Sequence, residues 1–174
     1  MIRLIAIFCI LSFDVAALTL EAKGNLDPFV TEALAEQMPQ AELLVVGSAN
    51  QAGDPIAALA LAHAIHETQT PVQVKAGAKI EGTALWLLFA ARGRITLEGT
   101  VEIGLRAWDD GQGHDAIMYP KQLPIHSRVI AIYEMAGLDT ETYWDDIARA
   151  PLETVWLPEE ERDALLDQLL SSPQ

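Results

Sequence analysis

The sequence predicts a single α/β domain built on a mostly parallel β-sheet flanked by helices. The chain has 174 residues, about the length of one domain, and 51% of them are hydrophobic and 21% charged, as in globular proteins. Short apolar runs alternate with helical patterns up to about residue 107. Because parallel strands need long crossover connections, usually helices, this alternation favours parallel strands joined by right-handed crossovers.

The alternation contains eight segments. In chain order the predicted elements are strand 18–25, helix 28–38, strand 41–47, helix 55–68, strand 71–77, helix 82–91 and two short strands within 94–105. The pairs Asp27-Pro28 and Asp54-Pro55 predict the starts of the first two helices. Aspartate is a good N-cap residue, and proline suits the first helical position.

Turns and buried strands have their own local signals. The apolar runs "AELLVVG" at 41–47 and "PVQVKAG" at 71–77 contain β-branched residues and are typical of buried strands. Gly24 predicts a turn after the first strand, and "SANQAG" at 48–53 predicts a polar loop.

The chain changes character after residue 105. A glycine- and aspartate-rich loop occupies 106–116, and a C-terminal helical extension follows from about residue 120. Its helices are predicted at 126–137, 140–150 and 158–170. Because the chain has no internal repeat and no long linker, residues 18–174 are expected to form one domain.

The N-terminus has the pattern of a secretory signal peptide. Arg3 gives a short basic region, Leu4 to Phe13 form an apolar stretch, and Val15 and Ala17 stand at positions −3 and −1 of a small-residue cleavage site. The apolar stretch is too short to span a bilayer as a permanent helix. An uncleaved anchor or a buried first strand remain the alternatives.

Cleavage after residue 17 would place the mature protein in the periplasm or outside the cell. Cys9 is the one cysteine of the chain, so a protein cleaved there has no disulfide, catalytic thiol or zinc–thiolate site. No later stretch reaches the eighteen or more apolar residues of a membrane span. The protein is therefore expected to be exported and soluble.

The acidic composition argues against nucleic-acid partners. The formal net charge is −14 and only 11 residues are Lys or Arg, none of them in a long basic run. Phosphate backbones are bound by clustered basic side chains. An acidic surface favours solubility and repels polyanions.

Two segments, "ANQAGDPIAALALAHAI" and "AKIEGTALWLLFAA", carry a family resemblance. They resemble the ClpP/crotonase-like superfamily, in particular the exported bacterial branch related to the Clp protease and signal peptide peptidase A. The resemblance covers Leu18 to about Ala107 and implies repeated strand–strand–helix units. It also implies a glycine pair that forms the oxyanion hole, where this chain has Ala52 and Gly53.

The same resemblance assigns the family's catalytic positions. Ile80 stands where the family has its nucleophilic serine. Gly82 stands where the family's turn has its glycine. In "IGLRAW", Arg106 stands where the family has its general-base histidine. The resemblance also implies assembly into homo-oligomers, without a stoichiometry.

The side chains at these positions do not support serine hydrolysis. Ile80 has no heteroatom to attack a carbonyl, and Arg106 stays protonated and cannot accept a proton. Ala52 carries a Cβ where a glycine would tolerate positive φ. The sequence therefore predicts a catalytically inactive ClpP-like protein that acts by binding a protein or peptide, or in an assembly. This interpretation requires Ile80, Gly53 and Arg106 to converge on one pocket.

An enzyme of altered chemistry in the same pocket is the alternative. Ser48 precedes the expected oxyanion loop, and Glu81 lies beside the turn, so both are weak catalytic candidates. Turn formation at a strand end and a favourable helix dipole explain them more simply. Lys79 is a candidate general base only where a serine lies beside it to be activated, and no serine stands in this turn. An unrelated exported α/β protein is the third interpretation.

The sequence predicts no cofactor and no metal. His63 and His66 are spaced i, i+3 on one predicted helix, but a helix end with polar residues explains them better. The run "WDDGQGHD" at 108–115 lacks the ligand rhythm and bidentate Glu of an EF-hand. We expect a solvated surface loop there. The acidic helix at 158–170 is expected to pack on the domain or to bind a partner.

Overall fold

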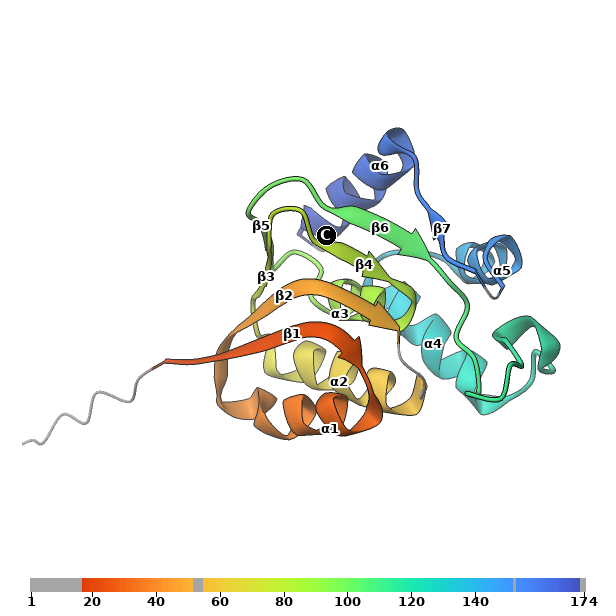
Figure 1. The fold of residues 1–174 in the computed structure, drawn as a ribbon, viewed down its shortest axis with the longest axis horizontal. Helices are drawn as coiled ribbons and strands as arrows, with labels where there is room; N and C mark the ends of the chain where they lie inside the picture. The colour runs from red at the N-terminus through yellow and green to blue at the C-terminus, as the bar shows by residue number, and fades with distance from the viewer. Residues whose placement is uncertain (1–16, 52–54, 152, 173–174) are drawn as a thin grey trace, which may run out of the picture.

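The computed structural model describes residues 17–51, 55–151 and 153–172 (Figure 1). Residues 1–16 of the predicted signal peptide, and Ala52 and Gly53, lie outside this part. The strands and α-helices are β1 (Leu18–Leu26), α1 (Pro28–Gln37), β2 (Ala41–Gln51), α2 (Pro55–Thr68), β3 (Val72–Val74), β4 (Lys79–Glu81), α3 (Leu85–Ala90), β5 (Ile95–Leu97), β6 (Glu102–Leu105), α4 (Pro124–Met135), α5 (Thr140–Arg149), β7 (Val155–Trp156) and α6 (Glu159–Leu170). Three short 3₁₀ helices are η1 (Met38–Gln40), η2 (Gly82–Ala84) and η3 (Ala116–Met118).

The sheet is mostly parallel, as predicted. Strand β2 pairs with β1 along one edge, and its other edge pairs first with β3 and then with β4. In the same way β3 pairs with β5, and β4 pairs with β6. Only β7 is antiparallel to its neighbour, β6, among the described strand pairs. In chain order, β1 and β2 are each followed by a helix, whereas the strand pairs β3–β4 and β5–β6 precede α3 and α4.

Strands β3 and β4 behave as one bent strand, and β5 and β6 as another. Backbone hydrogen bonds continue through the bends: Lys75 N donates to Val46 O at 2.9 Å, and Gly77 N to Thr100 O at 2.7 Å. These bonds satisfy backbone groups that the bends would otherwise leave unpaired. The two bends divide this side of the sheet into two parts. One contains β3 and β5, and the other contains β4, β6 and β7.

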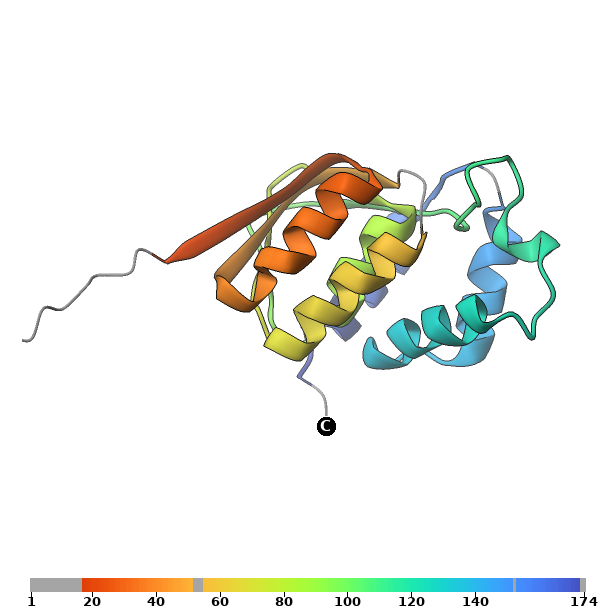
Figure 2. The same ribbon diagram turned by 90° about the horizontal axis from the view of Figure 1, so that it is seen from below.

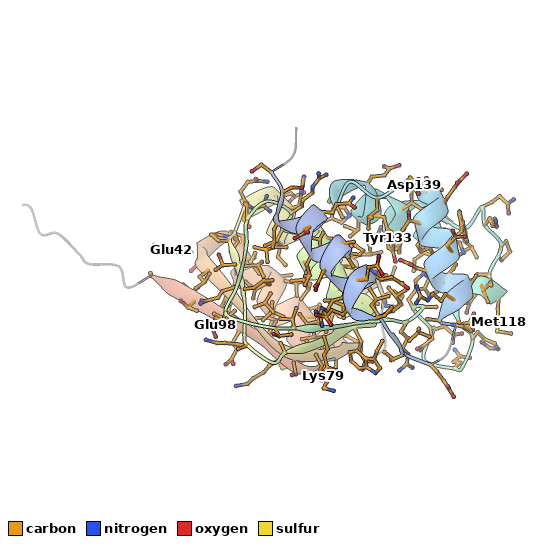
Figure 3. All side chains as sticks on the ribbon, turned by 90° about the horizontal axis from the view of Figure 1, so that it is seen from above. Glu42, Lys79, Glu98, Met118, Tyr133 and Asp139 are labelled. Atoms are coloured by element: carbon orange, nitrogen blue, oxygen red, sulfur yellow. The ribbon has the colours of Figure 1, made fainter. Side chains whose placement is uncertain are left out.

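One face of the sheet is covered by α1, α2 and α3 (Figure 2). Helix α1 begins as predicted, because the Asp27 side chain accepts a hydrogen bond from Val30 N at 2.9 Å. Helices α2 and α3 are almost wholly apolar on the sides that meet the sheet, which gives a continuous core. The opposite face is polar, and Lys79 points outward from it (Figure 3).

Three local predictions differ from the structure. The chain does not turn at Gly24, whose φ of +67° forms a bulge, so β1 continues to Leu26. Strand β2 likewise extends through Ser48 to Gln51, where a loop was predicted. Strand β4 was not predicted. Its three residues are too short for a periodicity signal, and pairing with β2 and β6 creates it.

The C-terminal extension has the three predicted helices. Helix α4 packs against α3 and α2, and α5 packs against α4 (Figure 2). Helix α6 lies at the β5 end, where Gly93 N donates to Leu169 O at 2.8 Å. Within the described part of the chain, none of the helices has the length and apolar character needed to cross a membrane.

Candidate binding site at the carboxyl edge of the sheet

The carboxyl ends of β2, β4 and β6 lie at one edge of the sheet (Figure 1). Helix α2 begins at Pro55 just beyond β2, and η2 begins at Gly82 directly after β4. The chain leaves β6 at Arg106. Open parallel sheets bind their ligands at this kind of edge, so a site is expected here.

Ile80 belongs to the core and not to the tip of a turn. It is the middle residue of β4, paired with Ala49 of β2 and Ile103 of β6, and its exposed fraction is 0%. The turn follows at Gly82, whose φ of +58° is in the left-handed region that favours glycine. The expected turn tip is therefore displaced by two residues, because residues 79–81 pair as a strand.

Gly82 and Arg106 line a common crevice with Tyr133, Asp146 and Ile147. The structure thus brings together two of the five residues that the family resemblance assigned to a pocket. The crevice has a volume of only ≈ 10 Å³, about the space one water needs. A substrate carbonyl has no room there.

Arg106 has a structural role in this crevice. Its Nη2 lies 3.6 Å from Asp109 Oδ2, and its Nε is buried without a hydrogen-bond partner among the described residues. A guanidinium that is always protonated cannot act as a general base. Its position, directly after β6, is the one the sequence indicated.

Ser48 and Glu81 do not line the crevice. The Ser48 hydroxyl accepts a hydrogen bond from Lys79 N at 3.2 Å, and Glu81 accepts one from the Thr154 hydroxyl. Glu81 and Ile80 are neighbours on one strand and therefore point to opposite faces of the sheet. Lys79 pairs with Glu102 at 2.8 Å on the outer face. These contacts link β4 to its neighbours β2 and β6 and to Thr154, which precedes β7.

A wider groove, here called the edge groove, lies beside the crevice. It has a volume of ≈ 510 Å³, within the range of ligand sites. Its lining residues come from the start of α2 and from the segment after β6: Pro55, Trp108, Asp110, Gly111, Tyr119, Leu123 and Ile125. The walls are mainly apolar and aromatic, with one carboxylate.

Asp110 organises one wall of the edge groove. Its carboxylate accepts hydrogen bonds from Gln112 N at 2.7 Å, His114 Nδ1 at 2.8 Å and the Tyr119 hydroxyl at 2.7 Å. The bonds from His114 and Tyr119 hold the pKa of Asp110 well below its usual value, so the group stays charged. Tyr119 in turn stacks on Trp108, with ring centroids 5.5 Å apart.

Behind Trp108 lies a buried chain of polar contacts. Trp108 Nε1 donates to the Tyr143 hydroxyl at 3.1 Å, and this hydroxyl lies 2.6 Å from His126 Nδ1. His126 has an exposed fraction of 0%, and burial lowers its pKa, so the imidazole is neutral at pH 7. Burial also raises the pKa of Tyr143 to about 12. The network orients Trp108 rigidly toward the groove.

The sequence analysis missed this network and the edge groove. Trp108, His126 and Tyr143 lie up to 35 residues apart along the chain. No local spacing links them. The sequence signal available was their type alone, since aromatic residues and histidine are common in binding sites.

Metal coordination finds no support in the part of the chain that the structure describes. No group of three or more His, Cys, Asp or Glu side chains in that part could hold a metal ion. The carboxylates of the acidic loop at 108–115 are instead satisfied by the loop and by residues next to it: Asp115 caps η3 by accepting from Ile117 N at 3.0 Å.

Comparison with known proteins supports the fold. No protein-family model and no curated protein sequence matches the chain. Among solved structures, a mutant of the 1510-N membrane-bound stomatin-specific protease in complex with a substrate peptide aligns with a TM-score of 0.57 at 12% identity, over 88% of this chain and 73% of the other. ClpP1 from Listeria monocytogenes aligns with a TM-score of 0.58 at 14% identity, over 84% and 86%.

A peptidase from Plasmodium falciparum is similar to the same extent, with a TM-score of 0.59 at 13% identity, over 84% of this chain and 91% of the other. Identities this low leave the fold as the common property. The chain thus has a ClpP-like fold: a curled, mostly parallel sheet with helices.

Proposed function

We propose that the protein is an exported, catalytically inactive ClpP-like protein that binds a peptide segment of a partner at the edge groove. The observation that carries the proposal is the crevice at Gly82 and Arg106. Side chains fill it, and the strand before it presents Ile80 to the core. A filled crevice beside an open apolar groove supports binding without hydrolysis.

The chemistry of the edge groove supports an apolar peptide as the ligand. Its walls combine Pro55, Leu123 and Ile125 with the stacked pair Trp108 and Tyr119. Trp108 is only 4% exposed, so it supports the half-buried Tyr119, Leu123 and Ile125, which supply most of the contact area. The stomatin-specific protease, which has the same fold, was solved with a substrate peptide.

Export is supported by the pattern of residues 1–17. Strand β1 begins at Leu18, directly after the proposed cleavage position, and pairs with β2 from its first residue. We expect the mature N-terminus to be Leu18. Mass spectrometry of the tagged protein recovered from the periplasm or medium checks this, and a full-length N-terminus would contradict cleavage.

Catalytic inactivity is tested with the purified protein and fluorogenic peptides or p-nitrophenyl esters. We expect rates equal to buffer, and no adduct with a fluorophosphonate probe, because Ser48 bonds to a backbone amide on the outer face. Hydrolysis that disappears in Ser48→Ala or Glu81→Gln would instead establish the alternative, an enzyme of altered chemistry.

Binding is tested by fluorescence anisotropy with labelled hexapeptides that carry apolar, acidic or basic side chains. We expect apolar peptides to bind, and Ile125→Gln in the groove wall to weaken them at least fivefold. Ile117→Gln is the matched control, because Ile117 is 52% exposed on the same segment and does not line the groove. Equal effects of both changes would contradict this location.

Assembly is a separate part of the proposal. The fold resemblance implies homo-oligomers, and light scattering of the purified protein measures the mass directly. A concentration-independent monomer would exclude a stable homo-oligomer and leave binding to another protein.

A further inference from the structure

A second cavity lies on the other side of Asp146, between α5 and α6. This α5–α6 cavity has a volume of ≈ 230 Å³, slightly below the usual range of ligand sites. Most of its wall is apolar: Phe89, Leu105, Leu138, Leu157, Ala164 and Leu165. Among the lining residues, none is shared with the edge groove. The size and walls suit a small molecule with an apolar body.

The polar end of the cavity is formed by charged side chains of α5 and α6. Asp146 and Arg149 come from α5, and Glu161 comes from α6. Arg149 forms its ion pair with Glu161, while Asp146 Oδ2 accepts a hydrogen bond from the Tyr133 hydroxyl at 3.1 Å. The three ionised groups sum to one negative charge. Because Arg149 is paired with Glu161, the remaining negative charge is that of Asp146.

Asp146 is held in low-dielectric surroundings. Figure 3 shows Tyr133 inside the molecule, in the region enclosed by the C-terminal helices. Burial raises the pKa of Asp146 to about 6, against a lowering by the Tyr133 hydrogen bond and by Arg149. An ionised carboxylate has about four acceptor sites, and Tyr133 uses one of them. A cation beside it would restore the interactions that burial removed.

We propose that the α5–α6 cavity binds a small organic cation, namely a protonated amine on an apolar body, with Asp146 as its anionic partner. The apolar wall accepts the body of the ligand, and the carboxylate of Asp146 fixes its ammonium group. An uncharged analogue lacks the second interaction, and an anion meets repulsion from Asp146 and Glu161. The inference is independent of peptide binding at the edge groove.

The test uses the purified protein with phenethylamine and its neutral analogue 2-phenylethanol, measured by calorimetry or ligand-observed NMR at pH 7.5. We expect the amine to bind at least tenfold more tightly than the alcohol. Asp146→Asn keeps the shape and removes the charge, so it should reduce amine affinity at least tenfold and leave alcohol affinity unchanged. Asp145→Asn, an exposed neighbour on α5, is the control with the same change in net charge.

The pH dependence provides an independent readout on the unaltered protein. The titratable groups around Asp146 are Tyr133 of α4, Arg149 and Asp145 of α5, Glu161 of α6, and Arg106 after β6, which lines the crevice with it. The amine stays protonated between pH 5 and 7.5, as a lysine does. We therefore expect its affinity to fall at least fivefold as pH falls from 7.5 to 5 and Asp146 takes up a proton.

Three results would overturn the proposal. They are equal affinities for the amine and the alcohol, an equal loss in Asp145→Asn and Asp146→Asn, and an amine affinity that does not change between pH 7.5 and 5. Circular dichroism establishes whether Asp146→Asn is folded. If it is not folded, the pH series on the unaltered protein decides.

Discussion

The sheet region, residues 18–105, and the C-terminal region, residues 106–172, use their polar side chains in different ways. In the described sheet region, Ser48, Lys79 and Glu81 lie on the outer face and hold strands and β7 in place. In the C-terminal region, His126 is fully buried and Asp146 lines two cavities. The buried His and Asp side chains of the described residues, His126 and Asp115, thus both lie in the C-terminal region.

The two regions differ in what stabilises them. The sheet and its helices are stabilised by apolar burial, which does not depend on a nucleophile or a base. Buried polar groups depend on specific partners, because an unpaired one costs free energy. The sheet therefore holds Ile80 in its core by apolar packing, whereas His126 and Asp146 depend on hydrogen-bond partners from other segments.

The comparison is tested most strongly by Ile80→Ser. Ile80 is fully buried between β2 and β6, so the change leaves a cavity and a buried hydroxyl. We expect a loss of about 3–5 kcal/mol in the free energy of unfolding, and no gain of esterase activity. Denaturant unfolding with an ester assay measures both. Lys79→Ser on the same strand should cost far less, and a stable, hydrolytic Ile80→Ser protein would contradict the structural role.

The pH dependence of stability tests the buried charge of the C-terminal region. The pKa of Asp146 is raised from 3.8 to about 6, so between pH 4 and 6 the folded state binds a proton that the unfolded state has released. Stability should therefore fall as pH rises through this range, by up to about 3 kcal/mol from this group.

Asp146→Asn should remove this pH-dependent contribution. Urea unfolding from pH 4 to 7.5 measures it, with Asp145→Asn as the control. Identical pH profiles of the unaltered protein and Asp146→Asn would show that Asp146 is not desolvated.

The Tyr143 hydroxyl links Trp108 to His126, and its removal should cost somewhat less. Tyr143→Phe leaves two buried donors or acceptors without this partner, which predicts a loss of about 2 kcal/mol. Thermal unfolding measures the loss, and tryptophan fluorescence reports a change at Trp108. Unchanged stability in Tyr143→Phe would mean that the network does not hold Trp108.

The smallest expected effect is at the ion pair between α5 and α6. Arg149 and Glu161 are 41% and 46% exposed in their side chains, so water and salt screen the pair. Arg149→Gln should change the free energy of unfolding by less than about 1 kcal/mol. It should also raise the affinity for the amine, because it removes the positive charge that partly compensates the carboxylates of Asp146 and Glu161. A loss above 2 kcal/mol would show that the pair, and not apolar packing, holds α6.

The sequence by itself determined the α/β class, the chain order of the main elements and the helix starts. These depend on local signals: the Asp27-Pro28 cap, the apolar run of β2 and the glycine at the start of η2 are read from adjacent residues. The ClpP-like fold followed from similar local patterns and agrees with the solved structures. Gly82, which the sequence places in the turn, has a φ of +58° at the start of η2.

Only the tertiary structure decided where the side chains point and which of them meet. Ile80 entered a strand because β2 and β6 pair with its backbone, and its neighbour Glu81 then had to face the opposite side. Asp146 is hydrogen-bonded to Tyr133, and Trp108 to Tyr143, because the fold packs together segments that are far apart in the chain. Periodicity and spacing report local geometry, whereas burial and charge pairing between distant segments depend on the folded arrangement.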